Sequence, residues 1–255
     1  MIHFVGAGPG AVDLITLRGK KLIEAADVIV YAGSLVNPQL LEDRKKDCEV
    51  HNSAYMTLEE VIEVMVCAEE EGKCTVRLHT GDPSIYGAVR EQMDELSRRG
   101  IDYEVCPGVS SFCGAAAALK AEYTLPGVSQ SVIITRTEGR TKVPERETIR
   151  SFAAHQATMV IFLSAGLLPR LQGELMEGGY PPSTPAAIVY KATWPEERIC
   201  RCTVEALADT AEREGIRKTA LIIVGRFLDG AGQRSELYHP AFTTEFRKGR
   251  PSEDR

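Results

Sequence analysis

Apolar and polar positions follow two recurring patterns along the chain, and together they predict strands that alternate with helices. Short apolar runs are typical of buried strands, and longer stretches with apolar residues every three or four positions are typical of helices. Capping residues mark helix starts: Thr16 precedes one helical stretch, and Thr57 with Glu60 forms a capping box before another. Strands that alternate with helices indicate a mainly parallel sheet.

The first half of the chain predicts one α/β domain, over residues 1–121. Its strands are expected at residues 2–5, 27–31, 49–51, 75–78 and 103–105. Its helices are expected at residues 16–26, 58–71, 85–99 and 111–120. Residues 122–130 interrupt the pattern, and their Pro126 and Gly127 predict a linker.

The second half predicts another α/β domain, over residues 131–245, followed by a flexible tail at residues 246–255. Its strands are expected at residues 131–135, 158–163, 186–190, 198–203 and 219–224. Its helices are expected near residues 145–154, 167–177 and 204–214. Adjacent strands around residues 194–197 lack an intervening helix, which predicts a hairpin and a mixed sheet. The predicted fold class is therefore α/β, with two domains, of which the first has a mainly parallel sheet and the second a mixed one.

Composition and charge narrow the possible functions. The 255 residues are 44% hydrophobic, and no apolar run approaches the roughly 20 residues that span a bilayer. The net charge of −6 disfavours a nucleic-acid partner, because phosphate binding needs clustered lysine and arginine. Seven scattered cysteines and an N-terminal pattern unlike a secretory signal indicate reduced thiols in the cytoplasm. We therefore expect small-molecule chemistry without a membrane partner.

Three loops follow predicted strands, at residues 6–10, 80–83 and 107–111. Ligands of open α/β sheets bind at the carboxyl ends of strands, because the loops converge there and helix N-termini point N–H donors into the crevice. Each loop also has a purely structural explanation, as a glycine turn, a helix start at Asp82 or a serine cap. The serines of the third loop are not expected to be nucleophiles, because no histidine lies near them in sequence.

The first loop differs from a dinucleotide-binding fingerprint. Its glycines are spaced G-x-G-x-G with Pro9 among them, and the fingerprint is G-x-G-x-x-G. A nicotinamide site also needs an acidic residue near the end of the second strand, where this chain has Ala32 and Gly33. A nucleotide-linked oxidoreductase is therefore disfavoured.

Taken together, in this order and at these separations, the three loops resemble the tetrapyrrole methylase family, the class III S-adenosylmethionine-dependent methyltransferases. The resemblance covers residues 1–245 and continues in the second domain at residues 161–164, 190–193 and 219–225. Narrower matches are similar to the branch that methylates carbon 11 of precorrin-4 or cobalt-precorrin-4 in cobalamin biosynthesis. These lie at residues 31–36, 138–141, 143–145 and 238–242.

The resemblance implies that S-adenosylmethionine binds in a cleft between the two domains, that S-adenosylhomocysteine leaves as the product, and that the enzyme is a homodimer. The implied cofactor-binding residues are Pro9, Thr80, Gly81, Asp82, Ile85, Ser110, Ser111, Leu163, Ala192 and Ala220. Related uroporphyrinogen methylases have an acidic residue where this chain has Ala32, so no catalytic base is assigned. The transfer needs no metal, and alignment of the reactants is the expected source of rate.

The tetrapyrrole substrate implied by this resemblance carries several carboxylates, which arginine pairs well. Arg136 and Arg140 are the candidates, although either also suits an exposed loop charge. Leu163 likewise suits the core of a strand, and Ala192 and Ala220 suit close packing. Two further functions stay open: methylation of ribosomal RNA or protein by a sister branch, with RNA disfavoured by charge, and noncatalytic tetrapyrrole binding.

Overall fold

The computed structural model describes residues 1–230 and 232–250 and divides into two compact units. Unit 1 comprises Met1–Ala118 and Tyr190–Arg198, and unit 2 comprises Leu119–Val189 and Ile199–Arg255. Residues 251–255 of the predicted tail lie outside the described part of the chain. Among the described helices, none has the length and apolar character needed to cross a membrane.

Unit 1 contains a five-stranded sheet in the order β3-β2-β4-β1-β5. Every pair of neighbouring strands is parallel, as the alternation of strands and helices predicts. The strands are β1 (Ile2–Gly6), β2 (Val28–Tyr31), β3 (Glu49–Asn52), β4 (Thr75–His79) and β5 (Tyr103–Cys106). Because β1 lies between β4 and β5, the loops after these three strands emerge side by side at one edge of the sheet.

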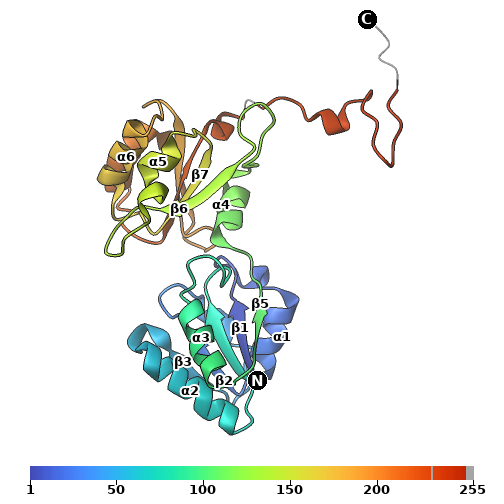
Figure 1. Ribbon diagram of the computed structural model, residues 1–255, viewed down its shortest axis with the longest axis vertical. Coiled ribbons are helices and arrows are strands. Elements are labelled where there is room, and N and C mark those ends of the chain that lie inside the picture. The colour runs from blue at the N-terminus through green and yellow to red at the C-terminus, as the bar shows by residue number, and fades with distance from the viewer. Residues whose placement is uncertain (231, 251–255) are drawn as a thin grey trace, which may run out of the picture. The chain divides into compact units, whose positions relative to one another are not determined.

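Helices cover both faces of this sheet (Figure 1). The helices of unit 1 are α1 (Leu17–Ala25), α2 (Leu58–Glu70), α3 (Arg90–Arg98) and most of α4 (Ser111–Leu119). Ile23 of α1 packs on one face with Val5 and Leu78, and Met65 of α2 packs on the other with Phe4. Thr16 caps α1 by accepting a hydrogen bond from the Gly19 N–H, and the capping box at α2 is present.

Helix α3 begins five residues later than the sequence pattern predicts, at Arg90. The backbone before it cannot form a right-handed helix, because Tyr86 and Ala88 have left-handed φ values of 53° and 50°. A Cβ atom on Gly87 would lie 2.2 Å from the carbonyl oxygen of Pro83. The segment that follows the second loop is therefore a strained turn that continues the loop.

Unit 2 contains a second five-stranded sheet, in the order β6-β7-β10-β8-β9. Its strands are β6 (Val132–Arg136), β7 (Thr158–Phe162), β8 (Pro185–Tyr190), β9 (Arg198–Thr203) and β10 (Ala220–Val224). Strands β6 and β7 are parallel, whereas β7 and β10 are antiparallel, so the predicted mixed sheet is confirmed. Its helices are α5 (Ile149–Ala153), α6 (Leu168–Glu177) and α7 (Leu207–Arg213).

The predicted linker at residues 122–130 lies within unit 2. Tyr123 is buried there and its ring packs edge-on against Phe227, with the ring centroids 5.4 Å apart. The Tyr123 carbonyl also accepts a hydrogen bond of 2.8 Å from the Thr158 hydroxyl at the start of β7. The division into two compact units does not test the predicted domain limits at residues 121 and 131, which stay predictions.

Candidate functional site

The loops after β1 and β4 are joined through their backbones. The Ala7 N–H donates to the carbonyl of His79 at 2.7 Å. Gly8 and Gly81 then exchange two hydrogen bonds of 3.2 and 2.8 Å, which form an isolated antiparallel bridge beyond the ends of the strands. The first and second loops are therefore joined to each other by backbone hydrogen bonds.

Three glycines pack against each other where the first, second and third loops meet. A Cβ atom on Gly6 would lie 2.6 Å from both the Cα of Gly108 and the carbonyl oxygen of Gly81. A Cβ atom on Gly108 would lie 2.2 Å from the same Gly81 oxygen. Because real Cβ contacts are longer than this, only glycine lets the backbones approach so closely. The junction keeps the loops together without any side chain between them.

Asp82 fastens the second loop to the third. Its Oδ2 atom accepts a hydrogen bond of 2.8 Å from the Gly108 N–H, and its Oδ1 atom accepts from both the N–H and the hydroxyl of Ser84. Burial raises the pKa of Asp82, but the hydrogen bonds from Ser84 and Gly108 outweigh it and hold the pKa below its ordinary value. The side chain is therefore a carboxylate, and about one of its four acceptor positions remains for a ligand.

The strained turn after Asp82 contains the half-buried Ile85. A buried network of hydrogen bonds stabilises this turn. Arg77 is 5% exposed; its Nε donates to the Oε1 atom of Gln92 at 2.9 Å. The Nε2 atom of Gln92 donates in turn to the carbonyl of Ala88 at 2.9 Å. Burial lowers the pKa of Arg77 to about 10, so it stays charged at neutral pH. This chain of hydrogen bonds holds the turn that positions Ile85.

The third loop leads into α4 at Ser110 and Ser111. Ser110 is buried, and its carbonyl accepts from the N–H groups of Cys113 and Gly114 in the first turn of the helix. A Cβ atom on Gly81 would lie 3.4 Å from the Ser111 nitrogen, so the second loop lies against the start of α4. The predicted positions of the second and third loops are thus brought together.

The segment Tyr190–Arg198, which belongs to unit 1, joins Ala192 to the loop after β1. Ala192 is 6% exposed. Next to it, the Thr193 hydroxyl accepts from the Ala11 N–H at 3.1 Å, and the Trp194 indole N–H donates to the carbonyl of Pro9 at 3.1 Å. Two predicted positions more than 180 residues apart, Pro9 and Ala192, therefore lie in one substructure of unit 1.

In unit 2, Leu163 and Ala220 lie at the same edge of the sheet. Leu163 directly follows the last residue of β7, and Ala220 is the first residue of the antiparallel β10. Leu163 is 65% exposed and has a φ of 53°, which is rare for a bulky residue. The alternative interpretation of Leu163 as core filling is therefore wrong.

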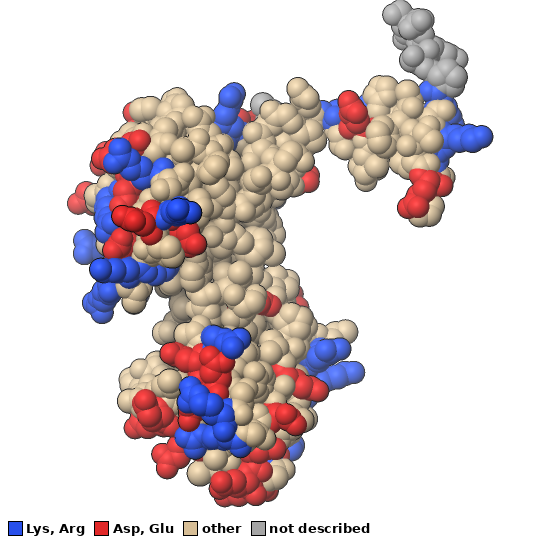
Figure 2. Space-filling model, viewed as in Figure 1, with Lys and Arg blue, Asp and Glu red and all other residues tan. Residues whose placement is uncertain are grey.

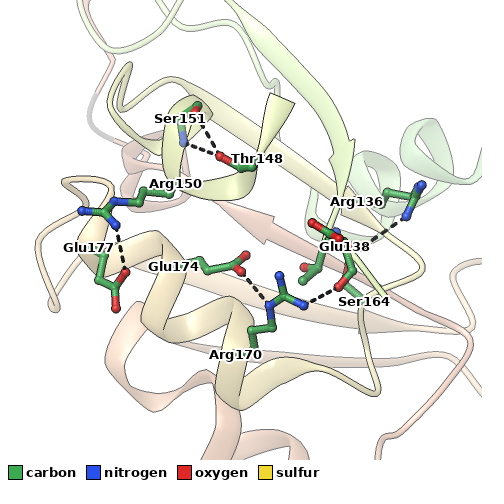
Figure 3. A network of polar contacts seen from close by, with 10 residues as sticks. Arg136, Glu138, Thr148, Arg150, Ser151, Ser164, Arg170, Glu174 and Glu177 are labelled. Atoms are coloured by element: carbon green, nitrogen blue, oxygen red, sulfur yellow. Dashed lines mark hydrogen bonds and ion pairs between the residues drawn. The ribbon is translucent and has the colours of Figure 1, made fainter. Parts of the chain in front are cut away.

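Of the two candidate substrate arginines, Arg136 ends β6 and Arg140 lies in the loop that follows. Figure 3 shows Arg136 directed along this loop. Its guanidinium donates to the carbonyls of Thr137, Thr141 and Lys142, at 3.4, 3.1 and 2.8 Å. Arg140 is exposed. Arg136 therefore holds the loop that carries Arg140, and its role toward a substrate stays a prediction.

A second arginine stabilises the same loop from α6. Figure 3 shows Arg170 between Glu174 and the loop, where it donates to the carbonyl of Glu138 at 2.8 Å. At the loop's start, the buried Ser164 hydroxyl accepts from the Thr137 N–H at 2.8 Å. The loop after β6 is thus ordered by side chains from two neighbouring elements.

The charges on the surface are mixed. On the face in Figure 2, basic and acidic side chains are interspersed on both units. The whole chain has 30 lysine and arginine residues against 36 aspartate and glutamate residues. Nucleic-acid binding proteins place clustered cations along one face, whereas on this face acidic side chains lie among the basic ones.

Sequence reasoning missed three residues that contact the first loop: Asn37, Thr193 and Trp194. Asn37 is buried, and its amide donates to the Gly10 carbonyl at 2.8 Å. Trp194 is the single tryptophan of the chain, and it follows a residue with a φ of 69°. A lone tryptophan in a loop was the signal available, but no pattern shows which distant backbone it contacts.

Comparison with known proteins identifies the class of protein that this fold and these loops define. Residues 1–208 match the family model of tetrapyrrole (corrin/porphyrin) methylases. The matched range includes all three loops and the segment Tyr190–Arg198. The chain therefore belongs to the tetrapyrrole (corrin/porphyrin) methylases. The predicted family and the predicted methyltransferase class are confirmed.

Within this family, the chain is similar to methyltransferases of one particular kind. The chain is 58% identical over 248 residues to the cobalt-precorrin-4 C(11)-methyltransferase of Methanocaldococcus jannaschii, with 97% of this chain and 96% of that protein covered. The solved structure of a cobalt precorrin-4 methyltransferase is 48% identical, with a TM-score of 0.87 over 89% of this chain and 95% of that one.

A more distant solved structure contains a bound ligand. It is the uroporphyrin-III C-methyl transferase from Thermus thermophilus complexed with S-adenyl homocysteine, 26% identical to this chain. Its TM-score is 0.75, and the match covers 91% of this chain and 95% of that one. The predicted α/β fold class, with a parallel and a mixed sheet, agrees with these structures.

Proposed function

We propose that this protein transfers a methyl group from S-adenosylmethionine to carbon 11 of precorrin-4 or its cobalt form, in the biosynthesis of cobalamin. The observation that carries the proposal is the similarity over nearly the whole length to a cobalt-precorrin-4 C(11)-methyltransferase. The three joined loops of unit 1 support it, because they lie at the edge of the parallel sheet where ligands bind.

The residues of unit 1 suit a polar cofactor of this kind. The half-buried side chains of Thr80, Asp82 and Ser111 offer hydroxyl and carboxylate groups beside the glycine junction. An ionised Asp82 with one acceptor position left is suited to an ammonium or hydroxyl group of the ligand. We infer that these residues bind S-adenosylmethionine together with the other unit 1 positions, which are Pro9, Gly81, Ile85, Ser110 and Ala192.

Leu163 and Ala220 are the inferred contacts from unit 2. Leu163 combines an exposed apolar side chain with a left-handed backbone conformation, which costs on the order of 1–3 kcal/mol. Thr219, directly before Ala220, has a φ of 56°. Strained backbone of this kind clusters at ligand sites, and here it occurs at Leu163 and directly before Ala220.

The reaction depends on alignment. When bound, the cofactor supplies an activated methyl group: the ring carbon provides the electron pair of the new C–C bond, and the electron pair of the C–S bond returns to sulfur. Holding two reactants in line contributes up to about 7–11 kcal/mol in favourable models. The joined loops and the buried Arg77 network supply such rigidity, and Ala32 offers no acid or base.

Isothermal titration calorimetry tests the cofactor part of this proposal. We expect the purified protein to bind both S-adenosylmethionine and S-adenosylhomocysteine, each with one site per chain. Nicotinamide dinucleotides serve as the control and are expected not to bind, because the chain lacks the ribose acid after β2. Failure to bind either sulfur ligand would contradict the proposal.

A further inference from the structure

The loop after β1 is held at three consecutive residues by side chains from distant parts of the chain. The Trp194 indole N–H donates to the Pro9 carbonyl at 3.1 Å, and the Asn37 amide donates to the Gly10 carbonyl at 2.8 Å. The Ala11 N–H donates to the Thr193 hydroxyl at 3.1 Å. We call Asn37, Thr193 and Trp194 the loop clamp.

Close packing accompanies these hydrogen bonds. A Cβ atom on Gly10 would lie 2.1 Å from Cδ1 of the Trp194 ring. A Cβ atom on Gly114 would lie 3.0 Å from Cβ of Pro9 and 3.1 Å from Cγ2 of Thr193. The indole ring and the Pro9 ring therefore occupy space that glycines leave open.

The clamp residues are themselves held in place. The Oδ1 atom of Asn37 accepts from the Gln39 N–H at 3.1 Å, so both ends of its amide are used. The Thr193 N–H donates to a carboxylate oxygen of Glu197 at 2.7 Å. Thr193 and Lys191 have φ values of 69° and 46°, and such strain persists only where the surrounding contacts determine the conformation.

We propose that Asn37, Thr193 and Trp194 are positioning residues, which hold the loop after β1 and the neighbouring Ala192 in the conformation that binds the cofactor. This inference rests on the proposed function. The loop contains glycines at positions 6, 8 and 10, which would leave its backbone with many accessible conformations. A clamp that selects one conformation before binding removes the entropic cost of ordering the loop when the ligand arrives.

The Trp194→Phe substitution tests this inference against a matched control elsewhere in the fold. It keeps an aromatic ring and removes the N–H that bonds Pro9. Tyr180→Phe likewise removes one aromatic donor to a backbone carbonyl, because the buried Tyr180 hydroxyl donates to Ala157 in unit 2. We expect Trp194→Phe to raise the Kd for S-adenosylhomocysteine about 2- to 12-fold, the range that corresponds to one net hydrogen bond. Tyr180→Phe lowers Tm and leaves this Kd unchanged.

A second pair of variants keeps the test independent of the smaller phenylalanine ring. Thr193→Val preserves the shape of the side chain and removes the hydroxyl that bonds Ala11, whereas Thr193→Ser retains that hydroxyl. We expect Thr193→Val to raise the Kd several-fold and Thr193→Ser to stay within about twofold of the wild type. In steady-state assays, the KM for S-adenosylmethionine rises in Trp194→Phe and Thr193→Val while kcat changes less.

The outcomes separate this inference from the proposed function. If the wild type binds no S-adenosylhomocysteine, the proposed function is wrong, and the clamp has no cofactor to position. If the wild type binds and both Trp194→Phe and Thr193→Val bind equally tightly, the positioning role is wrong and the proposed function stands. A Tyr180→Phe variant that weakens binding as much as Trp194→Phe, at equal loss of Tm, would show that the clamp only stabilises the fold.

Discussion

Asp82 connects two loops and still has room for a ligand, so its removal has two separable effects. Asp82→Ala eliminates the hydrogen bonds to Gly108 and Ser84. We expect the Kd for S-adenosylhomocysteine to rise about tenfold or more and Tm to fall by several degrees, because the Gly108 N–H is left without its acceptor. Calorimetry and thermal denaturation measure the two effects.

Ser84→Ala is the matched control for this substitution. It removes only the hydroxyl bond and leaves the bond between Asp82 and Gly108 in place. We expect it to change the Kd less than about threefold. A folded Asp82→Ala variant with wild-type affinity would remove Asp82 from the site.

His79 makes stability depend on pH in acid. Burial, together with the charge of Arg77, lowers the pKa of His79 to about 3 from its ordinary 6.5. Between these values the unfolded chain binds a proton that the folded chain does not, so the free energy of unfolding falls as pH falls from 6.5 towards 3. The slope from this one group is at most about 1.4 kcal/mol per pH unit.

His79→Phe removes this titration and retains a ring to stack on Phe4, whose centroid lies 6.2 Å away. We expect urea midpoints measured from pH 7 to pH 4 to decline less steeply in this variant than in the wild type. The wild type, measured over the same pH range, is the reference. An unchanged slope in His79→Phe would contradict the buried neutral state of His79.

We expect Leu163 to lower the stability of the fold and to strengthen cofactor binding. It is 65% exposed in a left-handed conformation that asparagine tolerates better than leucine. Leu163→Asn should therefore keep or raise Tm, while the Kd for S-adenosylhomocysteine rises about tenfold through the lost apolar contact. Leu17→Asn, at another exposed leucine, is the control for both readings. A fall in Tm without a change in Kd would show that Leu163 serves the fold.

At the level of single residues, sequence reasoning found the three loops of the first domain but could not assign the contacts of their residues. The apolar run of β7 continues into Leu163, and nothing in that run distinguishes an exposed leucine from a buried one. The bond between Asp82 and Gly108 joins residues 26 positions apart and exists only because β1 separates β4 from β5. Strand order is a tertiary property that local patterns do not contain.

Among the elements, the glycine junction of the three loops is the feature most sensitive to substitution. Gly6→Ala would place a Cβ atom 2.6 Å from two other loops, and relieving this overlap costs about 1–3 kcal/mol. We expect lower Tm and loss of S-adenosylhomocysteine binding, measured by calorimetry on the folded variant.

Gly173→Ala is the same substitution where space is open. Gly173 lies inside α6, and a Cβ atom there meets nothing within 4 Å. Alanine should raise stability by up to about 1 kcal/mol through its higher helix propensity and leave binding unchanged. If Gly6→Ala and Gly173→Ala had the same Tm and the same affinity for S-adenosylhomocysteine, close contact of the three loops would not be needed for stability or binding.

The strands and most helices of both units follow from the periodicity of the sequence, but two elements do not. Helix α3 begins late because the residues after Asp82 turn sharply, and their apolar spacing still resembles a helix. The segment Tyr190–Arg198 runs from the last residue of β8 to the first residue of β9, which predicts that it belongs with the second domain. It groups with unit 1 through contacts of Thr193 and Trp194 that no local pattern encodes.

For the whole molecule, the two α/β units and the family are established, and other properties stay predictions. Among these are the cofactor cleft between the domains, the homodimer and the location in the cytoplasm. The seven cysteines are free thiols, which is compatible with a reducing compartment. Fold class could be predicted from alternation alone, whereas the substrate depended on short motifs that resemble one branch of the family.

The central claim is tested most directly by following a ¹³C-labelled methyl group. Purified protein is incubated with S-adenosylmethionine labelled in its methyl group and with precorrin-4, in parallel with and without cobalt. We expect one labelled methyl per tetrapyrrole, with NMR correlations that place it on carbon 11, in at least one of the two reactions. Label on a different ring carbon, or no transfer to either substrate by a protein that binds the cofactor, would contradict the proposed function.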